Sequence, residues 1–234
     1  VEGDRAVGVK LEDGSEHRAD YVISAADGHA TIFDMLAGRY ADAAVRGYYD
    51  RLPTFPPLLY IALGVDRSFE DIPPIANGIT FPLSKTVNVA NMELHQLGVL
   101  IYNFDPTLAP PGKTVLKAML SSDCDYWKRL HESDPDRYKS EKERAGDQIV
   151  SILDGRFPGL ADRVEMRDVA TPITFHRYTG NWKGSYEGWL PTGENLQMSK
   201  TLSGLDNFYM AGQWVEPGGG VPTSAISGRS VIQM

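Results

Sequence analysis

The sequence FYMAGQWVEPGGGVPTSAISGR, from Phe208 to Arg229, joins an apolar run to three consecutive glycines and then to a segment of small and apolar residues. This order predicts a buried strand, a glycine-rich turn and a last helix from about Thr223. Three adjacent glycines are costly to order, because glycine loses more backbone freedom on folding than any other residue. Such a corner lets the backbone approach a ligand closely, and the first helical N–H groups point at that ligand. The stretch is therefore a candidate anion or cofactor site, with a tight turn that binds nothing as the alternative.

The first forty residues have the patterns of a strand, a hairpin, a buried strand and a helix. Val1–Lys10 and Tyr21–Ala25 resemble strands, and the Asp13-Gly14 pair between them is a hairpin turn signal. The second strand, YVISAA, is continuously apolar, as expected of a strand that is covered on both faces. Asp27 follows it at the position of a helix N-cap.

Strands and helices are interspersed through the rest of the chain. A helix is predicted at Tyr40–Leu52, and a Ser140-x-x-Glu143 capping box predicts the start of another helix that runs through Leu153. The segments with strand patterns are Leu58–Val65, Gly78–Phe81, Val99–Phe104, Thr114–Ser121, Val164–Asp168 and Phe208–Ala211. Because no strict βαβ order emerges, the sequence predicts an α+β fold or a mixed-sheet α/β fold.

The composition excludes several classes of function. The 234 residues carry a net charge of −8, which argues against nucleic acid as a partner, since phosphate binding depends on clustered Lys and Arg. A single cysteine, Cys124, excludes an internal disulfide and suits the reducing cytoplasm. No apolar run approaches the roughly 18 residues that span a membrane. The segment PTFPPLLY, from Pro53, is the one candidate for peripheral membrane contact, and its pattern favours burial instead.

Other motifs have ordinary structural explanations. PGKT, from Pro111 to Thr114, lacks the upstream glycine of a phosphate-binding loop and is predicted to be a turn before a strand. The five histidines and the cysteine show no zinc-ligand spacing, so no metal site is predicted. The absence of a GxSxG motif argues against a serine hydrolase of that type. The aromatic residues from His176 to Trp189 are predicted to pack in a core or a turn, with a pocket lining as the alternative.

A family resemblance rests on several segments in the same order. NFYMAGQWVEPGGGVPTSAISGR resembles the C-terminal signature of the phytoene desaturase, carotenoid isomerase and retinol saturase family of FAD-dependent oxidoreductases. GVKLEDGSEHRADYVISAAD is similar to the family's segment in which a strand returns to the FAD domain. YNFDPTLAPPGKTVL and TPITFHRYTGNWKGSYEGW resemble two further family segments. The matches cover most of the chain and are specific for the family, but they do not choose a substrate within it.

The resemblance implies two domains. One would be a substrate domain with a mixed sheet and helices, and the other a partial FAD-binding domain of the glutathione-reductase-like type. Residues 1–40 and 201–234 would belong to the FAD-binding domain, and residues 41–200 would form the substrate-binding domain.

The resemblance also implies a set of FAD contacts. It places Gly212 and Gln213 near the FAD pyrophosphate and ribityl chain. It places four residues beside the flavin ring: Gly219, Gly220, Val221 and Pro222. Ala25 and Ala26, at the end of the returning strand, would approach the ADP half. A helix N-terminus next to the ring would favour negative charge on the reduced flavin.

One family element is missing from the sequence. Members begin with a strand and a GxGxxG loop that binds the ADP pyrophosphate, and no GxGxxG occurs here. We therefore expect the chain to be the C-terminal portion of a longer enzyme, and we expect the chain alone to be inactive and to retain little or no FAD. A strand and a GxGxxG loop encoded upstream of Val1 would agree with this expectation, whereas a start codon directly before Val1 would favour a binding module.

The implied function is FAD-dependent oxidoreduction. A hydride would move between a hydrophobic polyene or lipid-like substrate and the flavin. No catalytic residue is assigned, because the cofactor supplies the chemistry and the protein supplies orientation and an apolar channel. Two alternatives stay open: a flavin amine oxidase-like enzyme, and a non-catalytic binding domain that lacks the nucleotide-binding segment.

Overall fold

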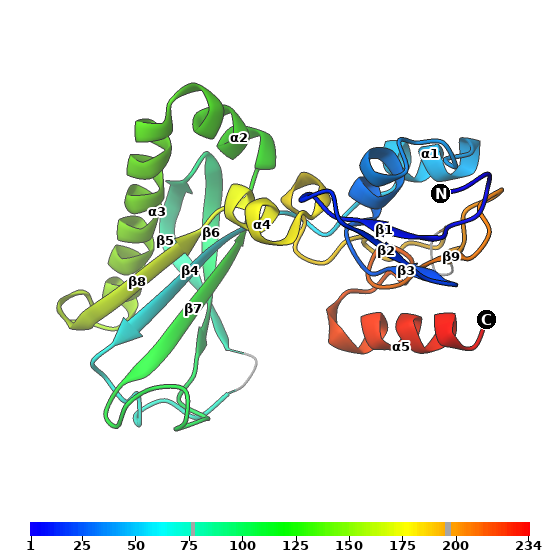
Figure 1. Ribbon diagram of the computed structural model, residues 1–234. Helices are drawn as coiled ribbons and strands as arrows, with labels where there is room; N and C mark the ends of the chain where they lie inside the picture. The colour runs from blue at the N-terminus through cyan, green and yellow to red at the C-terminus, as the bar shows by residue number, and fades with distance from the viewer. Residues whose placement is uncertain (76–77, 195–197) are drawn as a thin grey trace. The chain divides into compact units, whose positions relative to one another are not determined.

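The computed structural model describes residues 1–75, 78–194 and 198–234, and the chain forms two compact units. Unit 1 consists of Val1–Phe55 and His176–Met234, and unit 2 of Pro56–Phe175. Both units combine strands with helices, so the predicted mixed α/β class is confirmed (Figure 1).

Unit 2 is built on a five-stranded sheet in which every strand pair is antiparallel. The strands follow the order β5-β6-β7-β4-β8 across the sheet. Their bounds are β4 Leu58–Val65, β5 Ile79–Val89, β6 Met92–Ile101, β7 Thr114–Ser121 and β8 Val164–Ala170. The predicted strands at 58–65 and 114–121 match β4 and β7, and PGKT is the turn that leads into β7.

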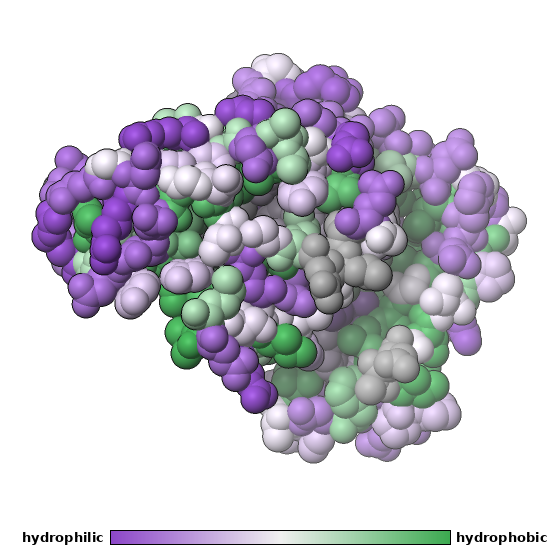
Figure 2. Space-filling model, turned by 90° about the vertical axis from the view of Figure 1, so that its right-hand side faces the viewer, coloured by the Kyte–Doolittle hydropathy of each residue, from purple (hydrophilic) through white to green (hydrophobic). Residues whose placement is uncertain are grey.

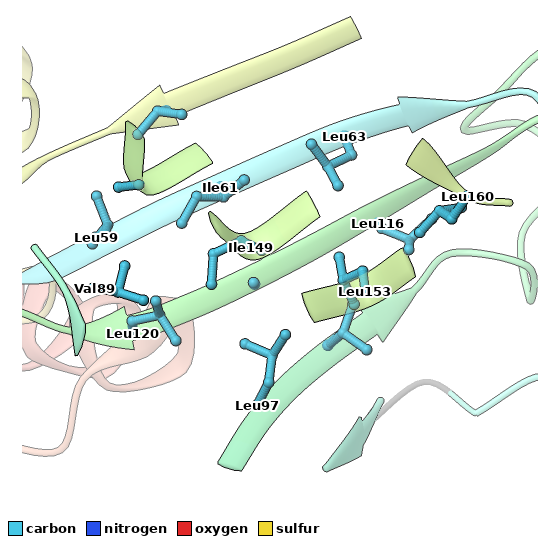
Figure 3. Close-up of a cluster of buried hydrophobic side chains, with 14 of the residues drawn as sticks. Leu59, Ile61, Leu63, Val89, Leu97, Leu116, Leu120, Ile149, Leu153 and Leu160 are labelled. Atoms are coloured by element: carbon cyan, nitrogen blue, oxygen red, sulfur yellow. The ribbon is translucent and has the colours of Figure 1, made fainter. Parts of the chain in front are cut away.

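One face of this sheet is covered by the long helix α3, Pro135–Arg156 (Figure 1). Alternate residues of the strands point into the shared core, where Ile61 of β4 and Leu116 of β7 are almost inaccessible to solvent. Ile149 and Leu153 of α3 pack against them, as Figure 3 shows. The inward-facing residues of the strands, at every second position, and those of α3, at helical spacing, therefore form one apolar layer.

The start of α3 differs from the sequence prediction. The helix begins at Pro135, where Asp134 accepts a hydrogen bond from the N–H of Arg137 (3.0 Å), and it does not begin at the capping-box pattern of Ser140. Proline is favoured in the first turn, because the N–H that it lacks would have no intrahelical partner there. Glu143, the second residue of the pattern, instead forms an ion pair with Arg167 of β8.

Three further short elements belong wholly or partly to unit 2. They are α2 (Cys124–Ser133), the 3₁₀ turn η2 (Ala161–Arg163) and α4 (Pro172–Thr179), which contains the boundary between the units. The sequence did not predict α2. It is held by Asp123, which accepts hydrogen bonds at its N-terminus, and by Trp127, whose Nε1 donates to Ser122 (2.9 Å).

Unit 1 has two small sheets. The strands β1 (Gly8–Lys10) and β2 (Glu16–Arg18) form an antiparallel hairpin around the predicted Asp13-Gly14 turn, although Glu16–Arg18 was not predicted as a strand. The strands β3 (Val22–Ser24) and β9 (Phe208–Met210) pair in parallel and bring the two halves of the unit together.

The remaining elements of unit 1 are helices and one 3₁₀ turn. They are η1 (Ala30–Met35, a π-helix), α1 (Ala43–Arg51), η3 (Trp182–Gly184) and α5 (Gly220–Ile232). The unit has its own buried core of Ala6, Ile32, Tyr40, Leu202, Leu205, Phe208, Met210 and Val215.

The division into units differs from the predicted domain boundaries. Residues 41–55 and the described part of 176–200 belong to unit 1, although both were expected in the substrate domain. The physical reason is pairing between segments that are distant in the sequence: the N–H of Phe55 donates to the carbonyl of Gly188 (2.8 Å), and that of Leu190 donates to the carbonyl of Pro53 (2.9 Å). The assignment of one unit to FAD and the other to substrate stays a prediction.

Two findings bear on membranes. None of the helices in the described ranges is both long enough and apolar enough to cross a bilayer. In the segment PTFPPLLY, Leu58 and Leu59 are buried, as the sequence pattern favours, and Leu59 belongs to the core of unit 2.

Candidate cofactor site

The carboxyl ends of β3 and β9 lie side by side in unit 1. Ser24 is in register with Met210, and the next N–H, that of Ala211, donates to the carbonyl of Ser24 (2.9 Å). A Cβ added to Gly212 would therefore stand 3.9 Å from the carbonyl oxygen of Ala25. Ligands of parallel α/β sheets bind at this end of the strands. Two predicted contacts from opposite ends of the chain are thus adjacent.

Gly212 has a conformation that favours glycine. Its φ is +99°, and its N–H donates to the hydroxyl of Ser227 in α5 (2.6 Å). Ser227 is fully buried and donates in turn to the carbonyl of Ser224 (2.6 Å). This chain of bonds attaches α5 to the end of β9. The sequence analysis missed Ser227, because nothing local distinguishes a serine that bonds to a residue fifteen positions away.

The three consecutive glycines form the entry to α5. Gly218, Gly219 and Gly220 have φ values of +127°, +68° and +80°, which residues with a side chain rarely adopt. Gly219 is the N-cap, and no side chain caps the helix. Among the described residues, no hydrogen bond uses the N–H of Gly220 or Val221 as a donor. These groups are available to a ligand at the positive end of the helix.

The glycine at position 219 also has an internal explanation. A Cβ there would stand only 2.7 Å from Cδ of Glu187, so the glycine makes room for this side chain. A carboxylate next to a helix N-terminus is electrostatically favourable. Glu187 is part of the candidate site, and the sequence analysis did not single it out. The only signal would have been its place in the aromatic segment that resembles the family.

The remaining predicted contacts have different environments. Gln213 is half-buried, and a Cβ added to Gly188 would stand 2.9 Å from its Cγ, so its side chain packs against that glycine. Pro222 and Val221 are exposed in the first turn of α5, as is Ala26 after β3. The site therefore combines a packed side, at Gln213, with an accessible side at the start of α5.

An aromatic cluster supports the site from the interior of unit 1. Trp189 is fully buried, and its Nε1 donates to the carbonyl of Trp214 (3.1 Å). Tyr49 of α1 lies 5.0 Å from the Trp189 ring, and His29 stacks on Trp182 with 5.5 Å between ring centroids. The expectation that these aromatic residues pack together is confirmed for Trp182 and Trp189.

Asp27 connects this cluster to the start of η1. Its two carboxylate oxygens accept hydrogen bonds from the N–H of Ala30 and from the N–H of Trp182, both at 2.8 Å. The first bond is the predicted cap, whereas the second links residues 155 positions apart, which no local pattern indicated. The pKa of Asp27 is raised because burial disfavours the charged carboxylate, and this effect outweighs the two hydrogen bonds.

The helix that carries the glycine run exposes apolar side chains. In α5, Ser227 and Val231 are buried, while Val221, Ile226 and Ile232 are exposed. Figure 2 shows the side of the molecule that lies on the right in Figure 1, and apolar residues gather in the lower part of this view. An exposed apolar surface of this kind is typical of a site that contacts a ligand or another polypeptide segment.

The chain is similar to flavoproteins over its whole length. A family model described as "Flavin containing amine oxidoreductase" matches residues 1–231. A chloroplastic prolycopene isomerase of Daucus carota is 30% identical over 97% of this chain and 37% of the relative. A phytoene desaturase (neurosporene-forming) of Cereibacter sphaeroides is 24% identical over 95% of this chain and 44% of the relative.

A solved structure agrees at the level of the fold. The crystal structure of an oxidoreductase from Methanosarcina mazei superimposes with a TM-score of 0.58 at 20% identity, and it is matched over 100% of this chain and 47% of that one. The chain thus spans less than half the length of these proteins.

Proposed function

This chain belongs to the flavin containing amine oxidoreductase family, and we propose that it contributes the flavin-ring side of an FAD site in an oxidoreductase that acts on a hydrophobic polyene. The observation that carries the proposal is the glycine run at the start of α5, next to the joined ends of β3 and β9. When bound, FAD would supply the hydride chemistry, as acceptor or donor.

The residues of this corner fit such a cofactor. Gly220 has no side chain that would keep a flat ring away, and the free N–H groups of Gly220 and Val221 suit a carbonyl edge. Because those N–H groups belong to a helix N-terminus, they would favour negative charge on the ring. We assign Gly219 and Pro222 to the same ring, and Gly212 and Gln213 to the pyrophosphate and ribityl chain.

Ala25 and Ala26 are assigned to the ADP half. They follow β3 directly and are exposed, and Ala25 lies next to Gly212. Short side chains at the end of a parallel strand leave room for a nucleotide to cross it. In this assignment, the residues of the site bind and orient the cofactor, and none of them acts as a proton acceptor.

The substrate class follows from the relatives. Prolycopene isomerase and phytoene desaturase are named for polyenes, and we propose an uncharged polyene for this protein as well. Such a substrate dissolves in lipid, so we further propose a cytoplasmic protein that collects it by peripheral contact with a membrane. An apolar substrate requires no charged group for its recognition, which agrees with the absence of an assigned catalytic side chain.

Absorption spectroscopy tests the flavin assignment. The complete coding sequence that contains this chain should yield a protein with the visible bands of oxidised flavin, whereas residues 1–234 alone should yield a colourless one. In the complete protein, Val221→Glu places a carboxylate at the flavin edge and should weaken FAD retention by about tenfold or more. Val221→Thr, which is similar in shape and uncharged, is the control and should retain FAD.

The substrate assignment has its own test. Under anaerobic conditions, a polyene such as phytoene should bleach the flavin bands or, for the reverse reaction, reoxidise the bleached flavin. Bleaching by a primary amine and not by any polyene would favour the amine oxidase alternative. A complete protein that binds no FAD would favour the non-catalytic binding domain and contradict the proposal.

A further inference from the structure

Unit 2 contains a groove that the proposed function does not use. It has a volume of about 520 Å³ and lies between the edge strand β5 and one side of α3. The pairing of β5 with β6 shifts register between Pro82 and Val87, so the residues between them are not held by the regular ladder. In the helix, the lining positions include Ser151, Ile152 and Gly155. The groove is within the usual size range for small-molecule sites, roughly 300 to 1,000 Å³.

The floor of this groove is apolar. Phe81, Leu83 and Val87 of β5 and Ile152 of α3 are partly buried against the core of unit 2, and all four line the groove. The three β5 residues belong to the core-facing side of an edge strand that the helix does not fully cover. On the helix side, Ser151 and Gly155 are small, and a Cβ added to Gly155 would meet no atom within 4 Å. A hydrocarbon chain could therefore pack against the apolar floor and occupy the open space beside Gly155.

The charges at the groove have a single sign. Lys85 and Arg156 line it, and no Asp or Glu does, although the chain carries a net charge of −8. Neither cation has an ion-pair partner among the described residues. Arg156 lies over the Phe81 ring, with 6.0 Å from Cζ to the centroid, which sets its guanidinium beside the apolar floor. Ser84 and Ser151 add two hydroxyl groups to the lining.

From this combination we propose that the groove binds a single-chain amphipathic anion, with its carboxylate or phosphate head at Arg156 and Lys85 and its hydrocarbon chain along Phe81 and Ile152. Cations that have no acidic partner gain from an anionic ligand, and the half-covered apolar residues gain from a hydrocarbon chain. An uncharged polyene would make no use of the two cations. The ligand class is therefore distinct from the proposed substrate.

Isothermal titration calorimetry on residues 1–234 tests the proposal with four probes. The two anionic amphiphiles are used below their micelle-forming concentrations, and dodecanol is used below its solubility limit. Dodecanoate and dodecyl phosphate share a chain and differ in the head, dodecanol lacks the charge, and inorganic phosphate lacks the chain. We expect saturable one-site binding of at least one anionic amphiphile. The tighter of the two identifies the preferred head. Dodecanol should bind at least about tenfold more weakly, and inorganic phosphate should not bind measurably.

Two kinds of variant locate the site. Gly155→Phe fills the groove from an exposed helical position that has open space, so it should abolish binding while the melting temperature stays the same or rises. Arg156→Gln and Lys85→Gln keep the shape and should each weaken binding by about tenfold. Lys139→Gln, an exposed cation on the same helix outside the groove, is the matched control and should bind like the parent chain.

Several results would overturn the proposal. They are the failure of both anionic amphiphiles to bind, equal affinity for dodecanol, and binding that Gly155→Phe leaves unchanged. A loss in Lys139→Gln as large as in Arg156→Gln would show general attraction to positive charge and would equally contradict a site in the groove. Because circular dichroism and melting temperature report on folding independently, an unfolded Gly155→Phe would leave the two charge variants to decide.

Discussion

Asp27 joins the start of η1 to the aromatic cluster of unit 1 through hydrogen bonds from Ala30 and Trp182. Asn in its place keeps one acceptor oxygen and loses the other. We expect Asp27→Asn to lower the free energy of unfolding by about 1 to 2 kcal/mol at neutral pH. Chemical denaturation measures this change. Asp34→Asn, at an exposed site in η1, is the control and should change the free energy by less than about 0.5 kcal/mol.

The raised pKa of Asp27 also predicts a pH dependence. The carboxyl group of Asp27 binds a proton more tightly in the folded state than in the unfolded state, where its pKa is near the ordinary 3.8. The stability that this protonation contributes is therefore fully present below pH 3.8 and is lost as the pH rises through the raised pKa of Asp27. The difference in unfolding free energy between the parent chain and Asp27→Asn should be larger at about pH 4 than at about pH 7. A difference that grew with pH would contradict the raised pKa.

Gly219 provides a second test at a single position. Gly219→Ala would strain a backbone with φ of +68° and press a Cβ against Glu187, so we expect a loss of about 1 to 3 kcal/mol in unfolding free energy. Gly228→Ala in the same helix meets no atom within 4 Å and should instead gain about 0.5 to 1 kcal/mol. The double variant Glu187→Ala with Gly219→Ala removes the contacts with Cδ and Oε2 of Glu187, leaves Cβ of residue 187 at 3.0 Å and retains the backbone strain. Full recovery in the double variant would mean that the strain at position 219 is negligible.

Among the elements, the sheet of unit 2 has two unlike faces. On β7, Leu116 points into the core and is 1% exposed, whereas Met119 points the other way and is 42% exposed. We expect Leu116→Ala to cost about 3 kcal/mol of unfolding free energy, and Met119→Ala less than about 1 kcal/mol. Equal losses in denaturant titrations would show that the second face is also packed.

The elements also show where local patterns fail. The capping box at Ser140 and Glu143 lies inside α3, because Asp134 and Pro135 form a better start one and a half turns earlier. Glu143 is used across the unit instead, where it pairs with Arg167. Gly146 lies in the same region, and a Cβ there would stand 2.9 Å from Cδ of Arg167. Arg167 is distant from both Glu143 and Gly146 in the sequence, so no local pattern predicts either contact.

For the whole molecule, the two units differ in chain continuity. Unit 2 is one continuous segment, Pro56–Phe175, with its own core and sheet. We expect residues 56–175 to fold alone, because a contiguous unit that buries its own core needs no other segment. A cooperative thermal transition and dispersed amide resonances would verify this. A disordered spectrum would mean that unit 2 depends on residues of unit 1.

The sequence alone determined the features that depend on local chemistry. The strand alternation of β4 and β7, the Asp13-Gly14 hairpin and the glycine run before α5 all follow from backbone and side-chain preferences within a few residues. The ordered family segments in turn identified the flavoprotein family, which the family match over residues 1–231 confirms.

Only the tertiary structure decided what lies next to what. The ends of β3 and β9 meet, Glu187 lies against Gly219, and Asp27 reaches Trp182 across 155 positions. The unit boundaries at 55 and 175 likewise depend on pairing between distant segments, such as the hydrogen bond from Phe55 to Gly188. Such contacts depend on the sum of many weak interactions over the folded chain, and no single stretch of residues records that sum. The glycine run within Phe208–Arg229 therefore predicted a site, and only the folded structure showed which residues lie next to it.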